Sequence, residues 1–266
     1  IALLVAVIGS VAVVPLVRGD AQGPVFTVKN ESGLSRTINV AGFPVVATDN
    51  PFFVDLGANG RRCVTCHQPE NNMTVSATGV QARFEKTGGT DPIFRPNDGS
   101  NSPLADVSTV EARRAAYSML LTKGVIRIGI PIPADAEFDL LDVRDPYGYA
   151  GHNTNGNELS LFRRPLPTTN LVFLSTVMWD GRETIQKGSR AAINFDLAHQ
   201  ANSATQGHAE APNPISQATR DQIVAYEMGL YTAQVFDLTA GELNAAGATG
   251  GPEALSRQPF IFGIND

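Results

Sequence analysis

The most constraining feature of this chain is the segment Cys63-Val64-Thr65-Cys66-His67, which has the pattern C-x-x-C-H. Two thiols with this spacing can add to the two vinyl groups of one porphyrin, as in the attachment of c-type haem. His67 directly follows the second cysteine and is then placed to bind the iron as an axial ligand. The chain has no other cysteine, so no disulfide competes for this pair. We therefore predict one covalently bound haem c, with His67 as the metal ligand.

Two other interpretations of the same segment are open. A tetrahedral zinc site needs two more Cys or His ligands, and the remaining histidines, His152, His199 and His208, are too scattered to form a familiar zinc pattern. A redox dithiol of the thioredoxin type belongs inside a βαβ unit, and the pattern of the flanking sequence predicts none.

The first residues predict an anchor. Residues 1–17 are almost entirely apolar and are followed by Arg18, so residues 1–18 are predicted to form a single transmembrane helix that contacts the lipid bilayer. A cleaved signal peptide is the alternative. Since c-type haem is attached outside the cytoplasmic membrane, the predicted location is the periplasmic face of the inner membrane. The net charge of −6 argues against nucleic acid as a partner.

The remaining chain is predicted to be mainly α, a cytochrome c-like haem domain with long loops and short strands. Residues 19–49 predict an extended arm or small hairpin, and residues 50–266 the haem domain, which we expect to continue in a missing C-terminal half. Helices are predicted over residues 107–124, with Ser108 or Thr109 as the N-cap, and from residue 216 to about residue 236. Short strands are predicted over residues 125–133 and 138–143.

The loop of residues 88–103 is long, polar and without periodicity. Its side-chain oxygens can coordinate Ca²⁺, with Asp91, Asn97, Asp98 and Asn101 as candidate ligands. The alternative is an ordinary surface loop rich in Asp and Asn.

Three segments in order carry a family resemblance. They are NGRRCVTCHQPE (residues 59–70), RPLPTTN (164–170) and MWDGR (178–182). Together they resemble the N-terminal haem domain of bacterial di-haem cytochrome c peroxidases, a family similar to the di-haem enzymes that mature a quinone cofactor. The resemblance implies reduction of hydrogen peroxide with electrons from a cytochrome or cupredoxin donor. Only one C-x-x-C-H is present here, so a second haem would come from a missing domain or another subunit.

The resemblance also implies roles for particular residues. Trp179 would be the electron-transfer bridge, and Glu210, with His208 beside it, the catalytic acid/base. His152, in a Gly-His pair, would be the displaceable sixth ligand. Guanidinium groups match carboxylates, so Arg61, Arg62, Arg163 and Arg164 are candidate partners of the haem propionates.

The rival prediction is an electron-transfer cytochrome c subunit of a membrane respiratory or photosynthetic complex, without peroxidase activity. Methionine as the sixth ligand closes the iron and raises its potential. Met119 is the first candidate for this ligand, and Met73 and Met178 are weaker ones. A structural subunit with a vestigial haem is a third interpretation.

Overall fold

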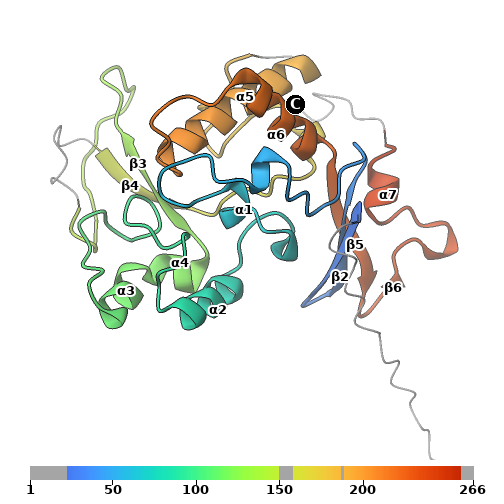
Figure 1. Cartoon of the computed structure of the whole chain (residues 1–266), viewed down its shortest axis with the longest axis horizontal. Helices are drawn as coiled ribbons and strands as arrows, with labels where there is room; N and C mark the ends of the chain where they lie inside the picture. Colours follow the sequence, from blue (N-terminus) through green and yellow to red (C-terminus); the bar gives the residue numbers. More distant parts are fainter. Residues whose placement is uncertain (1–22, 150–157, 187–188, 259–266) are drawn as a thin grey trace, which may run out of the picture.

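The computed structural model describes residues 23–149, 158–186 and 189–258 (Figure 1). Helices α5 (Arg190–Gly207) and α6 (Gln217–Met228) pack against each other above the short helix α1 (Cys63–Cys66). On the other side of α1 lie α2 (Ala77–Thr87) and α4 (Ser118–Lys123). The C-x-x-C segment is thus at the centre of the molecule, between two groups of helices.

A four-stranded antiparallel sheet lies at one end of the molecule (Figure 1). Its strands follow the order β1-β2-β5-β6. They are β1 (Val25–Asn30), β2 (Gly33–Asn39), β5 (Leu230–Asp237) and β6 (Gly241–Glu242). Pairing of β2 with β5 places Asn39 opposite Leu230, so segments about 190 residues apart close the fold. Residues 19–49, predicted as an extended arm or small hairpin, contain β1 and β2, which pair with each other as part of this sheet.

A two-stranded antiparallel sheet lies at the opposite end. It consists of β3 (Ile126–Pro131) and β4 (Glu158–Arg163), with Ile126 opposite Arg163. The chain leaves β4 directly into the Arg-Pro segment that passes over α1. The short remaining elements are α3 (Val110–Ala116), α7 (Pro252–Leu255) and the 3-10 helices η1 (Pro51–Phe53), η2 (Pro69–Asn71), η3 (Leu171–Phe173) and η4 (Ala245–Gly247).

Helix α1 lies between two apolar clusters. Cys66 packs against one cluster, which contains Phe84 and Tyr117, and Cys63 packs against the other, which contains Phe52 and Tyr226. The hydroxyl group of Tyr226 donates to the carbonyl of Val45 at 2.6 Å, which satisfies the only polar atom of this buried side chain. Burial of large side chains on both flanks holds the four-residue helix in place, since so short a helix is not stable alone.

The mainly α prediction is wrong, because the structure is mixed, with 32% helix and 16% strand in antiparallel sheets. The helix predicted from residue 216 ends at Met228, and Leu230 begins β5. The following residues, LYTAQVFD, are rich in aromatic and β-branched side chains, and β2 supplies their partners. The strand predicted over residues 138–143 does not form, since β3 pairs with β4.

The helix predicted over residues 107–124 is present as two pieces, α3 and α4. The predicted N-cap is confirmed, since the Thr109 side chain accepts from the backbone of Ala112 at 3.0 Å. The helix breaks at Tyr117 because Asn101 forms hydrogen bonds with two backbone groups next to the break. The amide of Asn101 donates to the Ala116 carbonyl at 2.7 Å, and its side-chain oxygen accepts from the Met119 amide at 3.1 Å.

The predicted transmembrane helix, residues 1–18, lies outside the described residues. Within the described ranges, no helix combines the length and apolar character needed to cross a bilayer. The predictions of a membrane-anchored fold and of a position at the inner membrane's periplasmic face are therefore not supported.

Candidate functional site

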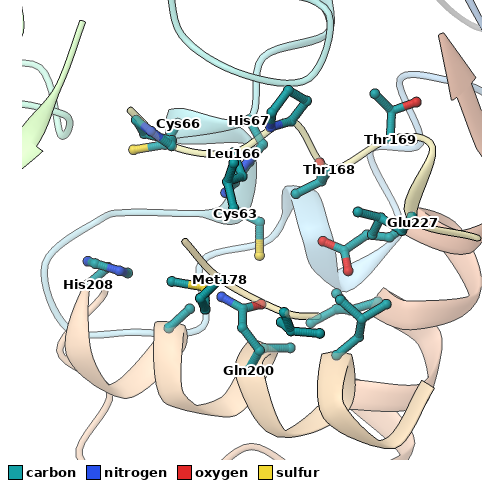
Figure 2. A pocket seen from close by; sticks show the side chains of 18 of the residues that line it. Cys63, Cys66, His67, Leu166, Thr168, Thr169, Met178, Gln200, His208 and Glu227 are labelled. Atoms are coloured by element: carbon teal, nitrogen blue, oxygen red, sulfur yellow. The ribbon is translucent and has the colours of Figure 1, made fainter. Parts of the chain in front are cut away.

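The C-x-x-C-H segment opens onto a large cavity between α1, α5 and α6 (Figure 2). Its volume is about 840 Å³, within the roughly 300–1,000 Å³ usual for cofactor sites. Most of its lining is apolar, and the apolar side chains include Leu166, Leu171, Leu174, Val177, Leu197 and Ile223. Both cysteines and His67 belong to one wall. An apolar space beside two thiols and an imidazole has the size and chemistry that a covalently held porphyrin needs.

His67 is held as a neutral imidazole. Its Nδ1 lies 3.3 Å from the carbonyl of Met73, to which it can donate, and the backbone of Leu166 lies within hydrogen-bond reach of the same ring. Burial lowers the pKa of His67 to about 4, so the imidazole is uncharged near pH 7. The Met73 carbonyl also accepts from the amide of Thr168 at 3.1 Å. The loop after the C-x-x-C-H is thereby tied to the Arg-Pro segment.

The Arg-Pro segment continues to β5 through Asn170. The Asn170 amide group donates to the Thr232 carbonyl at 2.9 Å, and its side-chain oxygen accepts from the Thr232 amide at 3.0 Å. This reciprocal pair explains the asparagine in the RPLPTTN motif in structural terms. The motif forms a wall of the cavity and connects it to the sheet.

The two cysteines do not have the properties of a redox dithiol. Burial raises the pKa of Cys63 to about 12 and that of Cys66 to about 11, whereas reactive dithiols have lowered values. The described part of the chain also contains no cluster of three or more His, Cys, Asp or Glu that could hold a metal ion.

Two side chains extend into the cavity from the side opposite the C-x-x-C-H segment. Figure 2 shows Met178 and Gln200 directed toward Cys63, with Gln200 on α5. Met178 adopts a left-handed backbone conformation with φ 72°, which is unusual for a residue with a side chain. A thioether in this position could ligate a metal bound by His67, and the structure thus favours Met178 over Met119. Met119 lies on α4 and does not line the cavity.

A buried ion network closes another side of the cavity. Arg61, only 3% exposed, pairs with the Asp98 carboxylate and donates to the carbonyls of Pro92 and Ile93, each at 2.8 Å. The second oxygen of Asp98 lies 2.5 Å from Nδ1 of His208, the residue after α5. Burial opposes ionisation of Asp98, but His208 and Arg61 outweigh it and hold the pKa of this carboxyl below its usual value.

Close backbone contact accompanies this network. The Ala58 amide donates to the carbonyl of Ala209 at 2.9 Å, and a Cβ on Gly57 would lie 2.0 Å from the same oxygen. Only glycine allows the segment before α1 to approach the end of α5 so closely. The network and this contact together place His208 at the cavity with Nδ1 engaged by Asp98.

Glu227 is another protonatable group that faces the cavity, and sequence analysis missed it. It lies on α6, is 5% exposed, and forms no hydrogen bond or ion pair with any described residue. Burial raises its pKa from 4.5 to about 8. The signal was present in the sequence, since Glu227 follows Ile223 and Val224 at helical spacing and so occupies the buried face of its helix.

Arginine side chains surround the cavity. Arg62 and Arg164 are exposed and line it, so they remain suitable partners for haem propionates. Arg61 is not, because its guanidinium is used by Asp98 and backbone carbonyls. Arg163 pairs with Asp180 at 2.7 Å, and Arg182 pairs with the same carboxylate at 2.9 Å.

Trp179 also lines the cavity but is 60% exposed, with its indole nitrogen donating to the Arg164 carbonyl at 2.9 Å. The described structure therefore places it between the cavity and solvent. Glu210 is exposed and does not line the cavity, and His152 lies outside the described residues. The candidate calcium ligands are engaged within the protein, since Asp91 pairs with Arg83 and Asp98 pairs with Arg61.

A scan against protein-family models, a search of curated proteins and a search of solved structures each give no match for this chain. The resemblance to di-haem peroxidases therefore stays a prediction that depends on the three motifs.

The buried ion network generates a first prediction. Arg61→Met leaves the Asp98 carboxylate buried without its main counter-charge, and we expect it to lower the free energy of unfolding by about 3–5 kcal/mol. Arg62→Met, at the exposed neighbouring position, should change it by less than about 0.5 kcal/mol. Urea unfolding of both variants measures the difference, and equal losses would contradict a structural role for the network.

Glu227 generates a second prediction, about the apo-protein. Its folded-state pKa of about 8 lies above the value of 4.5 expected in the unfolded chain. Between these two pH values the unfolded chain releases a proton that the folded protein retains, so the folded state loses stability as pH rises. Glu227→Gln removes this loss. At pH 9 the variant should be more stable than the wild type by on the order of 3 kcal/mol, with little of this difference at pH 4.5.

Urea unfolding at several pH values provides the measurement. Asp221→Asn is the matched control, because Asp221 is an exposed carboxylate on the same helix. If the stability of Glu227→Gln relative to wild type did not change between pH 4.5 and pH 9, the buried acid would not have the raised pKa.

Proposed function

We propose that this chain is a c-type haem redox protein that reduces hydrogen peroxide. The observation that carries the proposal is that Cys63, Cys66 and His67 share one wall of an apolar cavity large enough for a cofactor. A haem held there supplies a redox-active iron that exchanges single electrons. The His67 imidazole, which burial keeps uncharged near pH 7, could hold the iron of such a group.

Acid/base groups at the cavity support peroxide chemistry. Reduction of hydrogen peroxide to two water molecules takes up two electrons from the donor and two protons from solvent, and a positioned imidazole or carboxyl can relay these protons. His208 faces the cavity with Nδ1 fixed by Asp98, which leaves Nε2 to accept or return a proton. We therefore assign the acid/base role to His208, in place of the exposed Glu210.

Electrons must reach the site from a separate donor. Trp179 lines the cavity, and its exposed ring faces solvent. We propose that a redox partner, or a second haem domain or subunit, connects to the site through this residue.

An electron-transfer cytochrome without peroxidase activity is the second candidate function. The position of Met178, opposite the C-x-x-C-H segment, favours it, because thioether ligation would occupy the position that peroxide needs. The two candidates therefore differ in whether Met178 binds the metal.

The absorption spectrum of the ferric haem-loaded protein, recorded with and without hydrogen peroxide, separates them. We expect the wild-type spectrum to respond to peroxide, with turnover when an electron donor is added. His208→Gln should slow turnover by about 10²-fold or more, because it removes the proton acceptor. His199→Gln is the matched control, since His199 on α5 pairs with Glu183 at 2.6 Å but does not line the cavity.

A different outcome would favour the carrier. In that case the wild-type absorption spectrum would not change when peroxide is added. Met178→Ala would change the ferric spectrum, and the spectrum of this variant would then respond to peroxide. Equal losses of turnover in the two histidine variants would contradict the role assigned to His208.

A further inference from the structure

The proposed reduction of peroxide assigns no role to the Glu227 carboxyl, although this buried acid faces the cavity. A carboxyl that is 95% buried normally has a hydrogen-bond or charge partner. Glu227 has neither among the described residues, and Figure 2 shows its carboxyl directed into the cavity. Thr168, which also lines the cavity, has a buried Oγ1 atom without a hydrogen-bond partner in the part of the chain that the structure describes. The Glu227 carboxyl thus faces the space that the cofactor would occupy.

Glu227 also lies near the attachment point. Burial raises the pKa of the Cys63 thiol, and the nearby Glu227 carboxylate raises it further, as expected for two groups that lie close together. A haem bound through Cys63 would therefore share the low-dielectric cavity with Glu227. In such a medium a change of one charge on the cofactor acts strongly on a neighbouring carboxyl.

We propose that Glu227 is a redox-linked proton site, which takes up one proton from solvent when the haem of the cavity gains one electron. This inference rests on the proposed haem binding. The electron comes from an external one-electron donor and reduces the iron by one unit, and the proton forms the O–H bond of the Glu227 carboxyl. The summed charge of the cavity is then unchanged, which avoids an uncompensated negative charge in an apolar space.

None of the charged or titratable side chains around the cavity forms an ion pair with Glu227 in the described part of the chain. The titratable groups nearest to Glu227 are Cys63 on α1 and Tyr226 on its own helix. Helix α5, which packs against α6, carries Asp196 and His199. The remaining charged or titratable lining groups are Cys66, His67, the Asp98–His208 pair and the arginines at positions 61, 62, 163, 164 and 182. Burial is the only cause that raises the pKa of Glu227, and none of these groups contributes to the shift.

The test is the reduction potential of the haem-loaded protein between pH 5 and pH 10, measured with redox mediators. In the wild type we expect the potential to fall as pH rises through a window around pH 8, because reduction there takes up a proton. One proton per electron changes the reduction equilibrium tenfold per pH unit, so the slope approaches but does not exceed 59 mV per unit. In Glu227→Gln the reduction potential should no longer fall with pH in this window. At pH 10 it should therefore be higher than in the wild type. Asp221→Asn, on the exposed face of α6, should retain the wild-type slope.

Proton uptake measured with an indicator dye on reduction at pH 8 provides a second readout, and it should be larger in wild type than in Glu227→Gln. The haem content of each preparation, measured first, separates the two proposals. A preparation that binds no haem would contradict the proposed function and this inference with it. Equal slopes and equal proton uptake in haem-loaded wild type and Glu227→Gln would overturn the inference alone.

Discussion

The buried pair of Arg61 and Asp98 is the interaction on which the rest of the site depends. Arg61 directly precedes the C-x-x-C-H segment, and Asp98 belongs to a loop more than thirty residues away. Two opposite charges can remain in an apolar interior only if their hydrogen bonds are nearly all satisfied. The carbonyls of residues 92 and 93 and the imidazole of His208 satisfy them. Charge compensation therefore joins α1, the loop and the end of α5 around one cavity.

The two carboxyl groups of the cavity, Asp98 and Glu227, have pKa values shifted in opposite directions. Asp98 is ionised because an arginine and a histidine compensate it, whereas Glu227 lies on the same cavity without compensation and retains its proton to a higher pH. One carboxylate thus positions His208, and the other is available to exchange a proton. Groups whose environments displace their pKa values in opposite directions are typical of functional sites. Asp98 thus has a structural role, whereas Glu227 has the role that we propose in proton exchange.

Features that depend on residues adjacent in the chain, such as helix caps and the C-x-x-C-H motif, could be predicted from the sequence. The C-x-x-C-H segment, the Thr109 cap and the end of α4 at Gly124 depend on neighbouring residues, and each is where the sequence places it. The β5 strand and the pairing of Asp98 with His208 depend on residues distant in the chain, so periodicity could not reveal them. Glu210 was predicted from the family resemblance alone, whereas the helical spacing of Ile223, Val224 and Glu227 already indicates that Glu227 is buried.

Covalent haem attachment at Cys63 and Cys66 is the central claim, and intact-protein mass spectrometry tests it most directly. The chain would be produced together with a haem-attachment system and then digested for peptide mapping. The account predicts a mass increase of one haem, carried by the peptide that contains residues 63–67 and absent from the Cys63→Ser/Cys66→Ser double variant. An unmodified mass, with both thiols open to alkylation, would contradict it.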